Sequence, residues 1–262
     1  LAEAGISDLQ TFSIGFEGAG GEEGDEFRYS DLIAKRFGTR HHRINVDGAR
    51  LMDHLPDCIH AMSEPMVSHD NIGFYLLSRE VAKHVKVVQS GQGADELFGG
   101  YHWYQKLQGS GRPVEDYAEA FFDRSHEEYR DAVGEGLAVA DYSLDFVREN
   151  FARPGAVDPV DKALRLDMTV MLVDDPVKRV DNMTMAWALE ARVPFLDHEL
   201  VEYAAGIPPA LKLKQGGKYI LKQAARRIIP AEVIDRPKGY FPVPTLKYLK
   251  GETLDYVRDA LG

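Results

Sequence analysis

The sequence lacks most of the features that assign a chain to a membrane or a secreted class. It has one cysteine in 262 residues, Cys58, which excludes an internal disulfide framework and is compatible with a reducing compartment. No apolar run approaches the roughly 20 residues that cross a bilayer. The first ten residues have neither the basic nor the apolar region of a signal peptide. We therefore expect a cytoplasmic protein that neither spans nor binds a membrane.

Positive charge is also scarce, with 31 Lys and Arg against 42 Asp and Glu and a net charge of −11. This balance argues against a general nucleic-acid binder. Between Lys212 and Lys250, however, ten Lys and Arg stand against two acidic residues, a local charge of +8. Such a run is usually a solvated basic face. The alternative is a positive wall that faces phosphate groups, which needs independent support.

Hydrophobic periodicity predicts an α/β beginning. Strands are expected over residues 9–16, 41–46 and 86–90, the last of them buried, and helices over 25–38, 48–62 and 72–84. Strands that alternate with helices indicate βαβ units and a parallel sheet. The glycines of 17–24 do not read as a phosphate cradle, because three glutamates there would repel phosphate.

After Tyr101 the pattern is nearly all helical to residue 261. Pro and Gly interrupt it at 153–159, 206–209 and 236–244. We therefore divide the chain into an α/β nucleotide-binding part, 1–112, and a helical part, 113–262. Ligands of open α/β sheets bind beyond the carboxyl ends of the strands.

The stretch VVQSGQGADELFGGY, from Val87 to Tyr101, lies at such an end. It does not have the spacing of a nucleophile elbow, a Walker A loop or a dinucleotide fingerprint. Ser90 and Gly91 present a backbone that a flat ligand can approach closely. Asp95 is favoured as an oxygen ligand of Mg²⁺ that bridges phosphates. For Glu96, a role at the start of a helix and a functional role stay equally open.

Two later stretches have similar features. Glu190 and Arg192 precede a proline and a helix that starts at Asp197; the pair is either functional or a plain ion pair. A basic row and an apolar row, each with a spacing of four, are expected on one later helix: Lys218, Lys222 and Arg226, and Ile220, Ala224 and Ile228. Lys218, directly after Gly216-Gly217, is the member expected to reach a site. The histidines have no zinc-ligand spacing and are read as structural.

Three blocks together resemble the synthetase domain of the glutamine-hydrolysing asparagine synthetases. These are SGQGADELFGGY, the run from KRVDNMTM to LEARVPFLD, and KYILKQAARRIIP with RPKGYFPVP. Their order matches the family over nearly the whole chain. The sequences QSGQGADE and DDPVKRVDNMTMAW are most similar to those of the N-acetylglutaminylglutamine amidotransferase branch, which amidates an acylated dipeptide.

The resemblance implies a parallel α/β sheet of the ATP pyrophosphatase type and an ATP-dependent ligase. A carboxylate acceptor is adenylated with release of pyrophosphate, and ammonia from a glutaminase domain then displaces AMP. ATP and Mg²⁺ are the implied cofactors. Ile14, Ser90 and Gly91 would contact adenosine, and Asp95 would hold Mg²⁺-pyrophosphate. The implied catalytic residues are Lys218, Gln92 and Glu96, and the implied acceptor-binding residues are Glu190, Arg192 and Tyr101.

The sequence departs from this family in two ways. The Ser-Gly-Gly-x-Asp-Ser phosphate loop and the glutaminase domain are missing, so we expect a fragment of a longer protein that binds ATP poorly alone. Gln92 stands where asparagine synthetases typically have glutamate, which favours the dipeptide acceptor over aspartate. Asparagine synthesis from aspartate, a non-catalytic binding domain and a tRNA-modifying adenylase stay as alternatives. The oligomeric state, a homodimer included, stays open.

Overall fold

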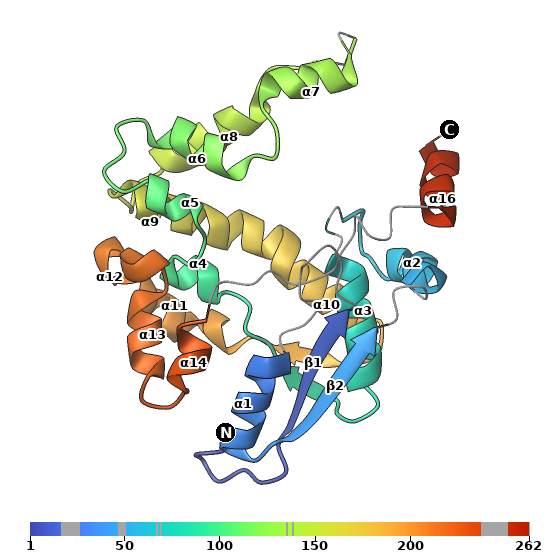
Figure 1. Ribbon diagram of the computed structural model, residues 1–262. Coiled ribbons are helices and arrows are strands. Elements are labelled where there is room, and N and C mark those ends of the chain that lie inside the picture. Colours follow the sequence, from blue (N-terminus) through green and yellow to red (C-terminus); the bar gives the residue numbers. More distant parts are fainter. Residues whose placement is uncertain are drawn as a thin grey trace. The chain divides into compact units, whose positions relative to one another are not determined.

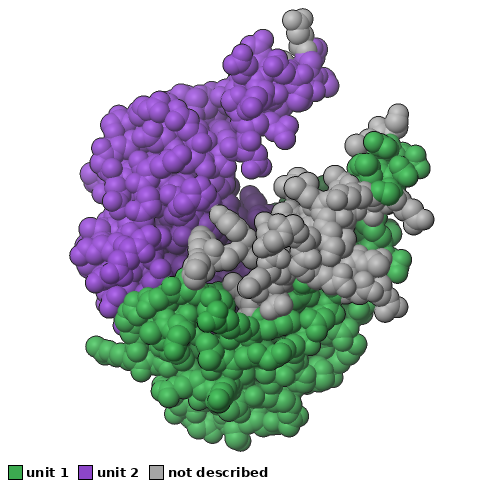
Figure 2. All heavy atoms as spheres, viewed as in Figure 1, with its two compact units in different colours: residues 1–89, 177–192, 225–262 green, residues 90–176, 193–224 purple. Residues whose placement is uncertain are grey.

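A computed structural model describes residues 1–16, 27–46, 51–66, 68, 70–134, 136–137, 139–236 and 251–261 (Figure 1). The chain forms two compact units, which Figure 2 shows in green and purple. Unit 1 consists of Leu1–Gln89, Val177–Arg192 and Ala225–Gly262, and unit 2 of Ser90–Pro176 and Val193–Ala224. Each is thus assembled from separate stretches. The division at residue 112 stays a prediction, because clusters of contacts do not by themselves define folding domains.

The first sheet of unit 1 pairs two parallel strands, β1 (Gln10–Phe16) and β2 (Arg40–Val46). Their register places Ile14 opposite Ile44 and Phe16 opposite Val46. The carboxyl ends of both strands carry apolar residues that are buried, which is what fixes this register. Both strands confirm the sequence-based prediction.

The second sheet of unit 1 pairs β3 (Val87–Gln89) with β4 (Glu190–Arg192), also in parallel. Here the structure corrects two expectations. The predicted burial of β3 is wrong: Val87 is 56% exposed. Among the described residues β3 pairs with β4 alone, so much of its surface stays uncovered. β4 is not predicted by the sequence, because three residues are too few for a period-two pattern.

The helices of unit 1 are α1 (Phe27–Phe37), α2 (Leu51–His60), α3 (Asp70–Val81), α10 (Lys178–Met185), α14 (Ala231–Ile234) and α16 (Glu252–Leu261). α1 ends at Gly38, whose φ of 63° lies in the left-handed region that favours glycine. The first three helices confirm predicted elements. The α/β class with parallel strands is therefore confirmed.

The core of unit 1 packs β1 and β2 against α2, α3 and α10. Its buried members are Ile14, Phe16, Val46, Leu51, Cys58, Tyr75, Leu76 and Met183. The Cys58 thiol lies 3.6 Å from the sulfur of Met183, and burial raises its pKa to about 12. Cys58 is therefore a small apolar core residue and not a nucleophile.

Unit 2 is helical. It holds α4 (Ala94–Phe98), α5 (Trp103–Lys106), α6 (Pro113–Phe121), α7 (His126–Val133), α8 (Tyr142–Ala152), α9 (Pro159–Leu166), α11 (His198–Ala205), α12 (Pro209–Leu213) and nearly all of α13 (Tyr219–Ala225). The turns η4 (Pro194–Leu196) and η5 (Lys214–Gly216) are 3₁₀-helical. Asp197 caps α11, accepting the Glu199 amide at 3.1 Å, as the predicted helix start requires.

Beyond α9 the chain continues through two π-helical segments, η2 (Asp167–Met171) and η3 (Val173–Val177). Pro176 lies inside the second. Proline has no N–H to donate and its ring crowds the preceding turn, and the wider π turn accommodates both effects. Such segments are often found near functional sites.

The predicted basic and apolar rows after Gly217 are wrong. α13 ends at Ala225, so Arg226 and Ile228 are not on it, and Lys218 precedes it in a left-handed conformation. Ile228 is exposed and contributes no apolar row. The helix ends early because residues 226–229 turn ahead of Pro230. None of the helices in the described stretches combines the length and apolar character needed to cross a membrane.

Candidate functional site

Two Gly-Gly pairs from distant parts of the sequence pack backbone against backbone in unit 2. A Cβ on Gly217 would lie closer than 3.0 Å to the carbonyl oxygen of Gly99, which real Cβ atoms essentially never do. The Lys218 amide donates to the Phe98 carbonyl at 3.0 Å. Glycine is therefore required at position 217 by the close approach of the two chains.

The loop before α13 has an unusual backbone. Gln215, Gly216, Gly217 and Lys218 have consecutive φ values of 51°, 83°, 106° and 53°. A left-handed conformation costs a non-glycine residue about 1–2 kcal/mol. The two non-glycine residues of this loop, Gln215 and Lys218, are therefore maintained in this conformation by their surroundings, here by the packing of Gly217 on Gly99.

This loop directs Lys218 to Asp95, the second residue of α4. The Lys218 ammonium lies 3.0 Å from Oδ1 and 3.1 Å from Oδ2 of Asp95. The two side chains are 29% and 27% exposed, so both stay accessible to a ligand. The structure thus brings together two predicted site residues.

Gly100 makes room for the Asp95 carboxylate. A Cβ at Gly100 would overlap Asp95 Oδ1. The Gly100 amide also donates to the Asp95 carbonyl at 2.8 Å, which closes α4. The second glycine of FGGY therefore fixes both the backbone and the carboxylate of Asp95.

Glu96, next to Asp95, faces inward and is 2% exposed. The Tyr101 hydroxyl donates to Glu96 Oε1 at 2.8 Å. Burial raises the pKa of Glu96, and the Tyr101 hydrogen bond opposes that rise. Burial and the neighbouring Glu96 carboxylate also raise the pKa of the Tyr101 phenol, which stays protonated as the donor. This pair joins two further residues that the sequence singles out.

The segment ahead of α4 is more open. Ser90 and Gln92 are half-buried and Gly91 is exposed. A Cβ at Gly91 would meet no described atom within 4 Å, and its φ is not left-handed. Nothing among the described residues therefore demands glycine there. A ligand that approaches the backbone closely remains as a reason.

Asp95 is the residue that the sequence predicts as a Mg²⁺ ligand. The described residues contain no group of three or more His, Cys, Asp or Glu that could hold one. Mg²⁺ characteristically takes one or two protein carboxylates and draws further ligands from water and bound phosphates. A single accessible carboxylate beside an ammonium group fits a Mg²⁺-phosphate ligand, and not a resident metal held by protein alone.

The chain matches the asparagine synthase family over residues 1–262. It belongs to that family. Similar proteins include glutamine-hydrolysing asparagine synthetases 1 and 3 of Bacillus subtilis strain 168. The first is 29% identical over 97% of this chain and 45% of its own length, and the second 31% identical over 91% and 41%. Asparagine synthetase B of Escherichia coli K12 is 27% identical over 94% of this chain and 37% of its own length. The chain spans less than half the length of these curated relatives.

The remaining predicted residues of this asparagine synthase domain lie in unit 1. Ile14 is buried in the core near the end of β1. Glu190 and Arg192, both exposed on β4, form the plain ion pair considered above, with Arg192 Nε 3.0 Å from Glu190 Oε1. The roles of these three residues in binding stay predictions.

A polar contact between α10 and the segment before α3 was not predicted from the sequence. Lys178 bonds Glu64, Arg179 donates to Ser68 Oγ at 2.6 Å, and Asn182 donates to Ser63 Oγ at 3.1 Å. α10 precedes the parallel strand β4, so its first turn lies toward the carboxyl end of the strands, where such folds bind ligands. The sequence KRVDNMTM contains a signal for this contact, because Lys178 and Asn182 are four residues apart and so lie on the same face of a helix.

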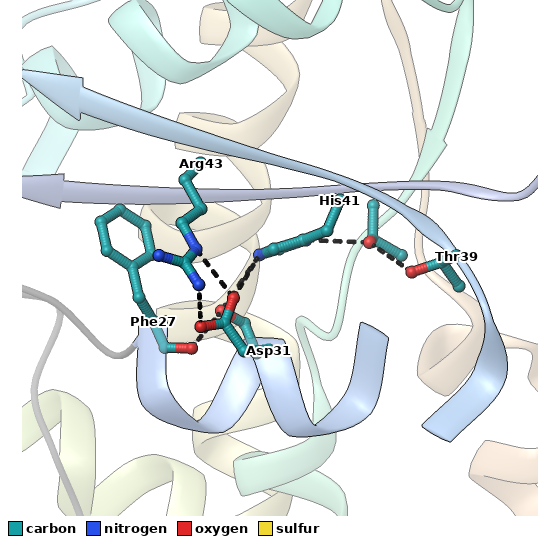
Figure 3. A network of polar contacts seen from close by, with 7 residues as sticks. Phe27, Asp31, Thr39, His41 and Arg43 are labelled. Atoms are coloured by element: carbon teal, nitrogen blue, oxygen red, sulfur yellow. Dashed lines mark hydrogen bonds and ion pairs between the residues drawn. The ribbon is translucent and has the colours of Figure 1, made fainter. Parts of the chain in front are cut away.

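The histidines of β2 hold structure together in this domain, in keeping with their interpretation from sequence. Figure 3 shows Arg43 paired with Asp31 of α1, and His41 lying between Asp31 and Thr39. One ring nitrogen of His41 bonds Thr11 at 2.9 Å and the other Ser30 at 3.2 Å. These contacts attach α1 to the first sheet.

The basic run after Lys212 does not form a uniform wall. Lys212 is buried, which lowers its pKa. Arg226 pairs with Asp235 at 2.6 Å, and the Arg236 guanidinium lies 5.1 Å from the centre of the Tyr29 ring. Lys238, Lys247 and Lys250 lie outside the described residues. Within the part of the run that the structure describes, Lys218 is the cation in contact with a predicted site residue.

Proposed function

We propose that this asparagine synthase domain forms an amide bond at the expense of ATP. When bound, ATP supplies the adenylyl group that activates an acceptor carboxylate, with loss of pyrophosphate; ammonia from a glutaminase domain then displaces AMP. The observation that carries the proposal is the pairing of Lys218 with Asp95. Two oppositely charged, accessible groups from distant blocks are held together by a left-handed loop and two glycine contacts.

We assign complementary roles to these two groups. Lys218 would neutralise charge that develops on the phosphates, and Asp95 would hold Mg²⁺-pyrophosphate. Their mutual ion pair keeps both side chains in place before a ligand arrives, which reduces the reorganisation that binding requires. Ser90 and Gly91 would contact adenosine. The open space around Gly91 supports that assignment.

We further propose that β1 to β4 belong to one parallel sheet of the ATP pyrophosphatase type. Both observed pairs are parallel, and a helix precedes each of β2, β3 and β4, as this arrangement requires.

The acceptor is proposed to be N-acetylglutaminylglutamine, on the ground of Gln92. A glutamate at this position can accept a proton or hold an ammonium-like group, whereas a glutamine forms only neutral hydrogen bonds. The names of the relatives favour aspartate instead. The proposed acceptor-binding residues are Glu190, Arg192 and Tyr101. Tyr101 would contact the acceptor with its ring, because its hydroxyl already donates a hydrogen bond to Glu96.

The test is acceptor-dependent formation of AMP by the full-length protein with ATP, Mg²⁺ and ammonia. N-acetylglutaminylglutamine and aspartate are compared at equal concentration. AMP and amide formed in equal amounts with the dipeptide support the full proposal. Asparagine formed at a higher rate than the dipeptide amide leaves the ligase in place and overturns the acceptor. The absence of AMP with both acceptors would favour a non-catalytic binding domain.

A further inference from the structure

A buried carboxylate in unit 2 has three aromatic donors. Asp167, the first residue of η2, is 0% exposed. Its Oδ2 accepts from the Trp103 indole at 2.9 Å and from the Tyr104 hydroxyl at 2.6 Å, and its Oδ1 accepts from the Tyr117 hydroxyl. A buried carboxylate is costly unless its oxygens are satisfied, so these donors make the residue tolerable.

Two of the three donors belong to α5, a helix of one turn. An isolated helix of this length is not stable in water, because its first turn fixes several residues for a single hydrogen bond. Asp167 therefore attaches α5 to η2 through Trp103 and Tyr104. Tyr117, on α6, donates to the other oxygen, and α6 also packs against α5.

The attachment extends from α5 to Glu96. Tyr101 lies two residues before α5, and its ring stacks on Trp103 with centres 4.3 Å apart and planes at 14°. The hydroxyl of the same tyrosine donates to Glu96. A continuous set of contacts thus runs from Asp167 through Trp103 and Tyr101 to Glu96.

We propose that Asp167 is a positioning residue for Glu96, which it serves by holding Trp103 and thereby the Tyr101 phenol. The inference rests on the proposed function only for the place of Glu96 in the site. A buried polar cluster that merely stabilises the core would have no effect on Glu96 beyond its electrostatic field.

The hydrogen bond from the Tyr101 hydroxyl to Glu96, which the proposal concerns, can be observed directly. The ¹³C chemical shift of the Tyr101 Cζ atom, which carries the hydroxyl, is sensitive to this hydrogen bond.

Asp167→Leu removes both charge and anchor, whereas Asp167→Asn removes the charge and keeps an oxygen for Trp103 and Tyr104. The measurement is NMR of full-length protein labelled with ¹³C-tyrosine, with the Tyr101 Cζ signal assigned from its absence in Tyr101→Phe. We expect Asp167→Leu to move this signal, as loss of the acceptor in Glu96→Leu does, and Asp167→Asn to leave it close to the wild-type position. An unchanged Tyr101 signal in Asp167→Leu overturns the proposal.

Trp103→Phe is the second variant, in case Asp167→Leu does not fold. It keeps a ring beneath Tyr101 and removes the indole donor, and we expect a smaller change of the Tyr101 signal in the same direction. Tyr117→Phe is the matched control, because it removes a hydroxyl donor to Asp167 and keeps the ring. An equal change in Tyr117→Phe, or none in Trp103→Phe, contradicts the proposal. The NMR measurement requires no ligase activity, so it decides this inference even where the proposed function fails.

Discussion

The ammonium of Lys218 lies 3.0 Å from the carboxylate of Asp95, although 123 positions of sequence separate the two residues. The pair is only partly buried, so its contribution to stability is modest, about 1 kcal/mol or less. The backbone around it is more costly than that, with left-handed φ values at Gln215 and Lys218. The left-handed backbone thus costs more free energy than the ion pair contributes to stability. We therefore explain this local structure by a role in binding and not by a role in stability.

Lys218→Met should abolish most activity with little effect on folding. Removal of a group that stabilises developing phosphate charge costs about 100-fold or more in kcat, while the melting temperature should fall by only a few degrees. Pyrophosphate release and thermal unfolding measure the two effects. Lys222→Met, one turn into α13, is the control and should retain normal activity. Equal losses in both variants would contradict the assigned role.

Gly217→Ala should destabilise unit 2 and displace Lys218. The added Cβ would meet the Gly99 carbonyl at a φ of 106°, and we expect a cost of about 2–4 kcal/mol. Gly216→Ala is the matched control: its φ is 83°, but no described atom lies within 4 Å of the new Cβ. It should cost only about 1–2 kcal/mol. Urea unfolding compares them, and equal costs would show that the Gly217–Gly99 contact is not tight.

Some parts of the fold and of the candidate site could be predicted from the sequence, and others could not. β1, β2 and α1 follow from local periodicity, and the importance of Lys218 and Asp95 follows from the motifs around them. The short α13 was missed although Pro230, ahead of which the chain turns, is visible in the sequence. The left-handed Lys218 does not follow, because the backbone there is set by contact with Gly99, far away in sequence. The Asp167 cluster has no local signal either, since its donors come from two other helices.

Glu96→Gln should change how stability depends on pH. The pKa of Glu96 is raised by burial above its ordinary value of 4.5. The folded state therefore holds this proton more tightly than the unfolded state, and the stability gained is complete below pH 4.5 and lost as pH rises through the folded pKa. The variant has no such loss. The free energy of unfolding of the variant should therefore increase relative to that of the wild type as pH rises across this range. Urea unfolding at several pH values measures the difference; a difference independent of pH would show that Glu96 is not perturbed.

Gln92→Glu should shift acceptor preference toward aspartate. The new carboxylate can hold an ammonium-like group, and we expect a change of about tenfold or more in the ratio of kcat/KM values for aspartate and the acylated dipeptide. Gln108→Glu, an exposed glutamine of the same unit, carries the same added charge and should leave the ratio unchanged. The same shift in both variants would indicate a general electrostatic effect and not a specificity position.

The most direct test of the proposed ligase chemistry follows the oxygen atoms of the acceptor. The full-length protein is given ATP, Mg²⁺, ammonia and N-acetylglutaminylglutamine or aspartate with ¹⁸O in the carboxyl groups, and AMP is examined by mass spectrometry. Adenylation of the carboxylate predicts one ¹⁸O in each AMP that is formed with amide. Amide formation with unlabelled AMP, or with ¹⁸O in a released phosphate and ADP as the nucleotide product, would contradict it.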